Sequence, residues 1–171
     1  MSSIQIQKSN IVDLQTDCIV NAANEGLWAG SGVCGAIFDA AGYDKLERAC
    51  QAIGHCDTGS AVITLGFALK AKYIIHAVGP VWNGGQFQEA EKLYNCYRCS
   101  LELAKENNCH SIGFPLISSG IFGYPQKEAW EIAIQACFDF INANTSYEMN
   151  IVFAVLSDAV YQQGQKILNL R

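Results

Sequence analysis

Asn21-Ala22-Ala23-Asn24, followed after a short gap by Gly30-Ser31-Gly32-Val33-Cys34-Gly35, decides the fold and indicates the kind of ligand. The apolar run Cys18–Val20 before it predicts a buried strand, and the residues after Gly32 predict the start of a helix. A glycine-rich turn between a strand and a helix presents backbone N–H groups at a helix N-terminus, where phosphates bind without formal positive charge. The two asparagines add amide groups beside this turn. We therefore predict a ligand that carries both phosphate and sugar.

Apolar runs alternate with helical patterns on both sides of this turn. The runs predict six strands, over Ile4–Gln7, Cys18–Asn21, Ser60–Leu65, Tyr73–Ala77, Ser111–Leu116 and Asn150–Leu156. The intervening patterns predict helices over Val33–Ala41, Tyr43–Ile53, Gln86–Asn107, Gln126–Ala143 and Ala159–Leu168. Several runs are almost entirely apolar, which is typical of strands covered on both faces. This alternation predicts an α/β fold, an α/β/α sandwich with a largely parallel sheet.

Length and composition limit the classes of protein that are possible. The chain has 171 residues, of which 50% are hydrophobic and 16% charged, so we expect one globular domain over residues 1–171. The net charge of −5 argues against nucleic acid as a partner, because binding to nucleic acid depends on Lys and Arg. No apolar run approaches the roughly 20 residues that cross a bilayer. The first residues lack the features of a signal peptide. We expect a cytoplasmic location and no membrane partner.

The cysteines favour packing over disulfide or metal chemistry. Without a signal peptide, the eight cysteines are not expected to form disulfides. Cys96-Tyr97-Arg98-Cys99 falls in a predicted helix, and His55-Cys56 lacks a second ligand pair. Small buried hydrophobic positions are the favoured interpretation, for example Cys18 in a strand and Cys137 in a helix. We therefore expect no metal.

Gly30-x-Gly32-x-x-Gly35 matches the dinucleotide-binding fingerprint, but its context does not fit. In that fingerprint the glycines follow the strand at once, whereas Ala22–Ala29 intervene here. The acidic residue expected about 20 residues further on is also missing from a strand end. The nearest one, Asp57, lies in a predicted turn before a strand. A nicotinamide-dependent oxidoreductase is therefore disfavoured.

A second glycine-rich loop, Ser118-Ser119-Gly120-Ile121-Phe122-Gly123-Tyr124-Pro125, follows the predicted strand Ser111–Leu116. Its small residues allow backbone N–H groups to approach a ligand closely. Phe122 has two open interpretations, packing over the loop or covering a sugar or base. Because loops at the carboxyl ends of strands share one crevice, the two glycine-rich loops are expected to face each other and to suit a diphosphate.

These motifs together resemble those of the macrodomain family, in particular its MacroD-like members. The resemblance rests on Asn21–Asn24, the Gly-x-Gly-Val turn, Ala40-Ala41-Gly42, Ile75-His76-Ala77-Val78-Gly79-Pro80 and Ser118–Pro125. It runs in order from about Asn10 to past Pro125. It implies a three-layer α/β/α sandwich with a mixed six-stranded sheet and a pocket for ADP-ribose. It also implies hydrolysis of ADP-ribose esters, on protein carboxylates or in O-acetyl-ADP-ribose, without a cofactor.

Site residues follow from the resemblance position by position. The diphosphate would lie against Gly32, Val33, Ser118, Ser119, Gly120, Ile121 and Phe122. Asn21 and Asn24 would face the distal ribose; Asn24 is the better candidate for the ribose hydroxyls, and the Asn21 amide is expected to tie the loop together. Asn10 stands where the family often has an Asp that bonds the adenine amine, and Leu156 where an aromatic often stacks on adenine. Ile11 is also expected to contact the ligand.

The chain departs from the MacroD-like pattern elsewhere in the same turn. The four-glycine run of many members is Ala29-Gly30-Ser31-Gly32 here, and Phe38 replaces a frequent His. Cys34 replaces an Asp that is thought to position or activate water, and a thiol is mostly neutral at pH 7. Cys34 has three interpretations, of which packing is preferred over orienting water, and orienting water over acting as a nucleophile. His76 is interpreted as a satisfied core residue.

Two functions remain open at this point. The Gly-x-Gly-Val-Cys turn also resembles that of alphavirus macrodomains, where hydrolysis without the Asp is attributed to a water held against the phosphate of the ligand. We therefore predict an ADP-ribosyl ester hydrolase in which Asn24 and Cys34 are the catalytic candidates. The alternative is a module that binds ADP-ribose or ADP-ribosylated protein without turnover.

Overall fold

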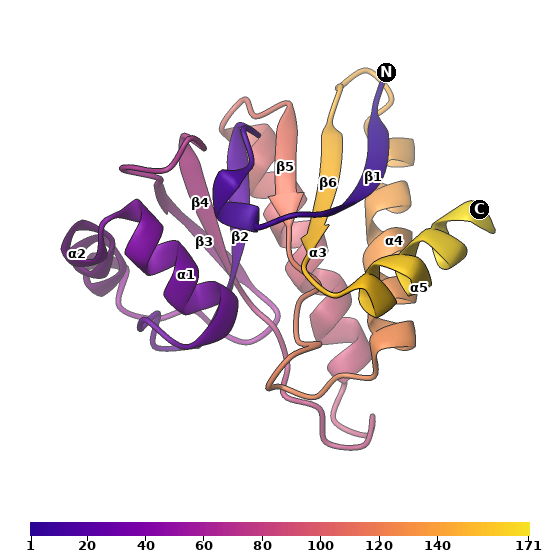
Figure 1. Cartoon of the computed structure of the whole chain (residues 1–171), viewed down its shortest axis with the longest axis horizontal. Coiled ribbons are helices and arrows are strands. Elements are labelled where there is room, and N and C mark those ends of the chain that lie inside the picture. Colours follow the sequence, from indigo (N-terminus) through magenta and orange to yellow (C-terminus); the bar gives the residue numbers. More distant parts are fainter.

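The computed structural model describes residues 1–171 as one sheet with helices on both faces (Figure 1). The strands are β1 Ser3–Lys8, β2 Cys18–Ala23, β3 Ala61–Leu65, β4 Tyr73–Val78, β5 Ser111–Phe114 and β6 Asn150–Val155. The helices are α1 Gly32–Ala41, α2 Tyr43–Ile53, α3 Glu89–Glu106, α4 Gln126–Ala143 and α5 Asp158–Asn169, with a 3₁₀ turn η1 at Ile11–Asp13.

The sheet has six strands in the order β1-β6-β5-β2-β4-β3. All neighbours are parallel except β3 and β4, so the sheet is mixed and largely parallel, which confirms the predicted fold class. The parallel register of β2 and β4 places His76 opposite Asn21. This pairing brings together two residues that are far apart in the sequence.

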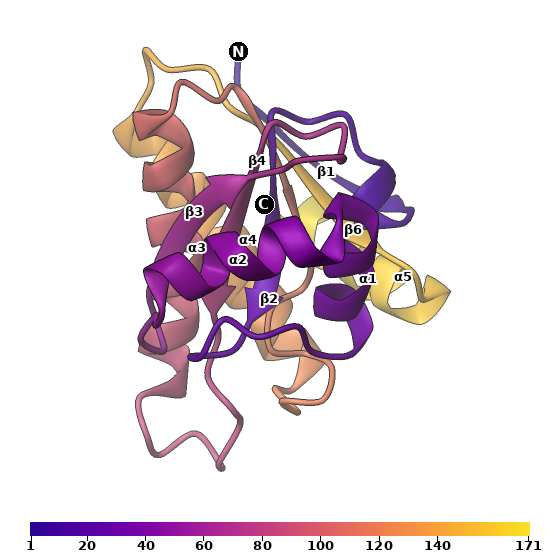
Figure 2. The same cartoon turned by 90° about the vertical axis from the view of Figure 1, so that its left-hand side faces the viewer.

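The helices form a layer on each side of the sheet. Helices α1 and α2 cover one face and α3 and α4 the other, as the edge-on view in Figure 2 shows. Helix α5 packs beside β1 and against α4, where Gly164 meets the Trp130 ring and the Trp130 indole N–H donates to the carbonyl of Val160 at 3.1 Å. Each layer encloses its own cluster of buried side chains against the sheet.

All predicted strands and helices are present, with small differences at their ends. Helix α3 begins at Glu89 and not at Gln86, because Gln88 adopts a left-handed conformation with a φ of 63°. Strands β5 and β6 end before Leu116 and Leu156, so both leucines belong to loops. Helices α1 and α2 are followed by Gly42 and Gly54 at positive φ, as predicted for glycine caps.

The cysteines occupy the positions that packing predicts. Seven of the eight are buried and Cys99 is half-buried, and all eight are free thiols. Cys18 and Cys137 are fully enclosed in the cluster beneath α3 and α4. None of the helices has the length and apolar character needed to cross a bilayer.

Candidate functional site

The loops that follow the parallel strands β2, β4 and β5 gather at one edge of the sheet, towards the bottom of Figure 1. The loop after β2 leads into α1, and the loop after β5 leads into α4. Because β2 and β5 are parallel neighbours, the two loops leave the sheet side by side. The edge therefore carries both glycine-rich segments that the sequence singles out.

The first segment leaves the N-terminus of α1 open. Gly32 has a φ of 58°, Ser31 makes no side-chain cap, and the first turn contains no acidic residue. The amides of Gly32, Val33 and Cys34 donate no hydrogen bond within the protein. A Cβ on Gly35 would lie 2.7 Å from the carbonyl oxygen of Gly30, so the turn closes only because Gly35 has no side chain. Unpaired amides at a helix N-terminus are the arrangement that favours an anion, in line with the predicted phosphate site.

The second segment, Ser118–Tyr124, forms a comparable loop. The amide of Tyr124 donates to the carbonyl of Ser118 at 2.9 Å, and the amide of Gly123 donates to the carbonyl of Gly120 at 2.9 Å. These bonds turn the loop so that the amides of the residues between them are left without a protein acceptor. The unpaired amides belong to Gly120, Ile121 and Phe122.

Ser118 is held in a strained but well-supported position. Its φ is 67°, its side chain is buried, and its hydroxyl has no partner. A Cβ on Gly79 would lie 2.2 Å from this hydroxyl, so the glycine makes room for it. Beside it, the hydroxyl of Ser119 donates to the carbonyl of Leu116 at 2.8 Å. The buried Ser118 hydroxyl is a free hydrogen-bonding group within the predicted diphosphate loop.

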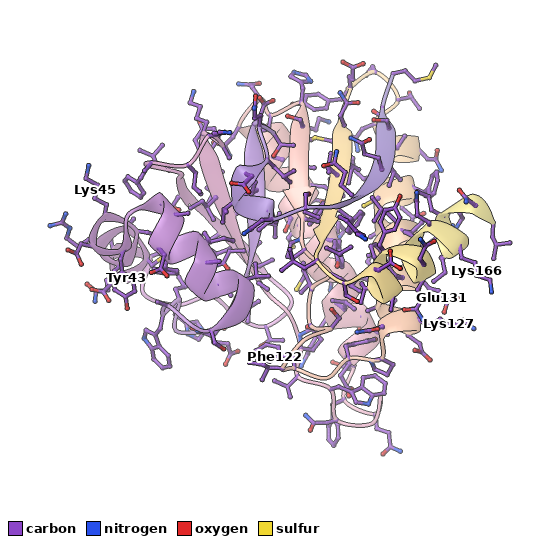
Figure 3. The ribbon with its side chains drawn as sticks, viewed as in Figure 1. Tyr43, Lys45, Phe122, Lys127, Glu131 and Lys166 are labelled. Atoms are coloured by element: carbon purple, nitrogen blue, oxygen red, sulfur yellow. The ribbon has the colours of Figure 1, made fainter.

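Phe122 and Ile121 lie at the outer edge of this loop. Ile121 is 86% exposed, whereas Phe122 is half-buried and lies among the loops at the lower edge in Figure 3. The carbonyl of Phe122 accepts from the amide of Trp82 at 2.8 Å, which joins this loop to the loop between β4 and α3. Packing and covering a ligand are both compatible with this position of the ring.

Asn24 closes the loop after β2. Its Nδ2 donates to the carbonyl of Trp28 at 3.0 Å, and its Oδ1 accepts from the amide of Trp28 at 2.9 Å. Both ends of the amide are therefore used within the loop. Contact between Asn24 and a ribose hydroxyl stays a prediction, in which the amide would have to share these bonds.

Asn21 lies deeper, at the carboxyl end of β2. It is 1% exposed, and its Nδ2 lies 3.1 Å from Nδ1 of His76 and 3.6 Å from Sγ of Cys34. Its Oδ1 is buried and has no partner. A buried acceptor without a donor is costly. The NH₂ contacts with His76 and Cys34 fit the expected tie within the turn, and contact of Asn21 with a ribose stays a prediction.

Cys34 is buried in the first turn of α1, with 5% of its surface exposed. Its Sγ accepts from the amide of Gly30 at 3.4 Å and donates to the carbonyl of Trp28 at 3.5 Å. Together with the Asn21 amide, these contacts use the thiol to hold the turn. This environment fits the packing interpretation, and no motif or contact places a histidine beside the sulfur.

His76 is enclosed by polar groups beneath this turn. Its Nε2 lies 2.9 Å from the hydroxyl of Thr64, and the ring is 1% exposed. Burial lowers the pKa of His76 from 6.5 to about 4, so the ring is neutral at pH 7. His76 is thus a satisfied core residue, as the sequence predicts.

The residues expected at the adenine end also come together. Ser9 donates its amide to Val155 at 3.1 Å, so the segments after β1 and β6 run next to each other. Asn10 is exposed and caps η1 by accepting from the amide of Val12 at 3.2 Å. Ile11 is buried beneath it, while Leu156 is 75% exposed. The Asn10 oxygen keeps a second lone pair for a ligand donor.

The model of the Macro domain family matches residues 20–133. A macro domain-containing protein of Chlorobaculum tepidum is 48% identical over 161 residues, covering 94% of this chain and 92% of that protein. The chain belongs to the macro domain family. An O-acetyl-ADP-ribose deacetylase of Salmonella gallinarum is 50% identical over 144 residues, covering 82% of this chain and 80% of that protein.

Solved macrodomain structures share the fold. The Oceanobacillus iheyensis macrodomain with ADP has a TM-score of 0.91 and 40% identity, covering 96% of this chain and 89% of that chain. The Trypanosoma brucei macrodomain in complex with ADP-ribose has a TM-score of 0.90 and 36% identity, covering 96% of this chain and 68% of that chain. These matches confirm the family that the motifs resemble.

Sequence reasoning missed one residue that shapes this macrodomain edge. Glu89 is 2% exposed, and its carboxylate accepts from the amides of Asn83, Gly85 and Phe87 at 2.6 to 2.9 Å. Burial works to raise the pKa of Glu89, but the backbone hydrogen bonds outweigh it and hold the pKa below its usual value. The sequence contains a pattern that indicates this role, because Glu89 is an acidic residue at a helix start and follows Gly84 and Gly85.

One group of side chains has the composition of a metal site. Glu25, His55 and Asp57 each offer a ligand atom within 4.8 Å of the others, and all are exposed. Internal bonds account for their closeness: Glu25 accepts from the amide and hydroxyl of Thr58, and His55 lies 2.7 Å from the Asp57 carboxylate. The group belongs to the contact between the loop after β2 and the loop before β3.

Proposed function

We propose that this macrodomain binds ADP-ribose and hydrolyses an ester at its distal ribose. The substrate would be mono-ADP-ribosylated Asp or Glu on a protein, or O-acetyl-ADP-ribose. The observation that carries the proposal is the pair of neighbouring loops whose amides, at Gly32–Cys34 and Gly120–Phe122, have no protein acceptor. A relative at 50% identity that is named O-acetyl-ADP-ribose deacetylase, and solved macrodomain structures with ADP and ADP-ribose, support it.

The charge distribution supports a diphosphate held by neutral groups. No Lys or Arg occurs between Asn21 and Gly42 or between Ser111 and Gln126. The lysines labelled in Figure 3 lie on α2, α4 and α5, to the left and right of Phe122 in that view. Backbone dipoles must therefore supply the attraction for an anion at this site.

In the proposed hydrolysis, the rate would depend on how the protein orients the ester and the attacking water more than on a strong base in the protein. In the proposed reaction, Asn24 holds the distal ribose hydroxyls and a water near Cys34 attacks the ester. The diphosphate of the ligand takes up a proton of that water as a local base. The ester bond between the acyl group and the ribose oxygen breaks, the proton passes to that oxygen to give the free ribose hydroxyl, and the acyl group leaves as the carboxylic acid. Binding fixes the water and the ester in one geometry. The barrier of the reaction is lower because the entropy of orienting them is already lost on binding.

A module that binds ADP-ribose without turnover is the second candidate. Cys34 favours it, because the thiol donates to the Trp28 carbonyl and the first turn of α1 carries no carboxylate. In this case the two loops would serve recognition alone.

One experiment separates the two candidates. The protein is incubated with a carboxylate-ADP-ribosylated protein and with O-acetyl-ADP-ribose, and free ADP-ribose is titrated in parallel by calorimetry. Release of the modification supports hydrolysis. Binding without release supports the module without turnover, and absence of binding contradicts both.

Cys34 is tested directly by two substitutions of similar size. Cys34→Asp restores a carboxylate, and we expect turnover to rise about 10-fold because a charged group can orient water more strongly. Cys34→Ser is the control, since it keeps a small neutral group. A turnover of Cys34→Asp that is unchanged or lower would contradict the packing role of the thiol.

A further inference from the structure

A chain of buried hydrogen bonds runs from the turn of α1 into the sheet. It starts at Asn21, whose Nδ2 lies 3.1 Å from Nδ1 of His76, and continues from Nε2 of His76 to the hydroxyl of Thr64 at 2.9 Å. The Thr64 hydroxyl donates to the carbonyl of Leu65 at 3.1 Å. These groups belong to β2, β4 and β3, so the chain crosses three neighbouring strands.

The donor and acceptor roles in this chain follow from the Thr64 hydroxyl, at the end opposite Asn21. The Thr64 hydroxyl has one proton, and we assign it to the Leu65 carbonyl, so that the Thr64 oxygen accepts from His76. The neutral ring therefore carries its proton on Nε2, and Nδ1 is an acceptor. Asn21 must then present its NH₂ group to His76.

This order leaves the Asn21 carbonyl oxygen free. The second Nδ2 proton points to Sγ of Cys34 at 3.6 Å, so the NH₂ group is used on both sides. Oδ1 is buried and without a donor. A buried acceptor of this kind destabilises the folded protein until a donor reaches it.

We infer that His76 and Thr64 are positioning residues, which hold the Asn21 amide so that its carbonyl oxygen accepts a hydroxyl of the distal ribose. The inference rests on the proposed function, because it assigns a role within the same site. Asn21 lies beneath Cys34 and the Trp28–Gly30 turn, at the end of the site where Asn24 also lies. Residues of β3 and β4 thereby act on a ligand that they do not touch.

The groups around His76 keep its ring neutral. Asn21 faces the ring from β2, Thr64 from β3 and Cys50 from α2, with Sγ of Cys50 3.9 Å from Nε2. Burial, with a smaller contribution from Cys34, raises the pKa of Cys50 to about 11, so this thiol is neutral as well. No charged side chain competes for the ring, and its pKa of about 4 keeps it neutral down to mildly acidic pH.

Thr64→Val tests the order of the bonds at nearly constant volume. Without the hydroxyl, the ring can move its proton to Nδ1, and the Asn21 amide can turn its oxygen towards it. The NH₂ group would then meet the ribose in place of the acceptor. We expect affinity for ADP-ribose to fall about 10-fold and turnover to fall at least as far.

Thr16→Val is the matched control. Thr16 is 9% exposed against 8% for Thr64, and its hydroxyl also donates to a backbone carbonyl, that of Cys18 at 2.9 Å. It lies at the opposite end of β2, so its loss should change affinity and turnover less than 2-fold. Thr64→Ser keeps the hydroxyl and should restore both values.

The proton position is read directly from the long-range ¹H–¹⁵N spectrum of the His76 ring at pH 7. A proton on Nε2 in the wild type, together with a shift towards Nδ1 in Thr64→Val, supports the inference. A proton on Nδ1 in the wild type overturns it, as does Thr64→Val binding ADP-ribose as tightly as Thr16→Val. If the wild type lacks turnover, the hydrolase proposal fails, while affinity and spectrum still decide the role of His76.

Discussion

The two loops that lead into α1 and α3 lie at the same edge of the sheet and differ in one respect, a carboxylate of the chain. At α3, the Glu89 carboxylate takes the amides of Asn83, Gly85 and Phe87. At α1, the amides of Gly32–Cys34 have no acceptor, Ser31 provides no cap, and the first turn has no acid. The loop before α3 is held by a carboxylate of the chain, whereas the turn before α1 has none.

The difference shows how a small domain decides where a phosphate binds. Amides in a turn attract any anion that fits, whether it belongs to the protein or to a ligand. A carboxylate in the chain fills one turn and fixes its loop. The absence of such a group leaves the other turn for a ligand, at some cost to stability.

Acidic pH should produce the largest change in stability, because it protonates His76 beneath the α1 turn and Glu89 in the loop before α3. The pKa of His76 is about 4 in the folded state against 6.5 for a free histidine, so the unfolded chain takes up its proton first as the pH falls. The free energy of unfolding should therefore drop by about 3 kcal/mol between pH 6.5 and pH 4. As the pH falls, protonation of Glu89 also removes the anion from the loop before α3, and the backbone hydrogen bonds that hold the pKa of Glu89 below its usual value delay this step.

Urea unfolding as a function of pH measures this loss. His76→Gln is the control, because it removes the titrating group and should flatten the curve between pH 6.5 and pH 4. A wild-type curve that is already flat there would show that His76 is not neutral and buried in solution.

Glu89→Gln should have the next largest effect and should act on stability. The amide that replaces the carboxylate has one acceptor oxygen for three backbone donors, so the loop at Asn83–Phe87 loses support. We expect the midpoint of thermal unfolding to fall by several degrees and the affinity for ADP-ribose to change little. Glu91→Gln, an exposed acid in the same helical turn, is the control and should leave the midpoint unchanged.

Ser31→Asp gives the turn before α1 a carboxylate of the chain, as Glu89 gives one to the loop before α3. The Ser31 backbone is already extended, so an aspartate can cap the helix without rearrangement and should add about 0.5–1 kcal/mol of stability. Its charge should repel the diphosphate and weaken ADP-ribose binding about 30-fold, or ~2 kcal/mol.

Ser31→Asn is the control for this change, because it caps equally well without charge. Calorimetric titration with ADP-ribose compares the three proteins. Equal affinities for the aspartate and asparagine variants would mean that the open α1 turn does not hold the diphosphate.

Local patterns were sufficient for most of the secondary structure. The predicted bounds of α2 and α4 match the structure, because helical spacing and a glycine or proline mark their ends in the chain itself. The start of α3 was predicted three residues early, because the loop before it is set by Glu89 through side-chain bonds to the backbone. The 3₁₀ turn η1 was missed, since three residues carry too little periodicity to detect.

The sequence by itself determined the family, the glycine-rich turns and the absence of cations near them, because each depends on residue type and spacing along the chain. Only the tertiary structure decided what the two asparagines do. Asn24 bonds to Trp28, four residues away, while Asn21 bonds to His76 across the sheet. The register of β2 and β4 creates that second contact, and a register between strands 55 residues apart cannot be read from either strand alone.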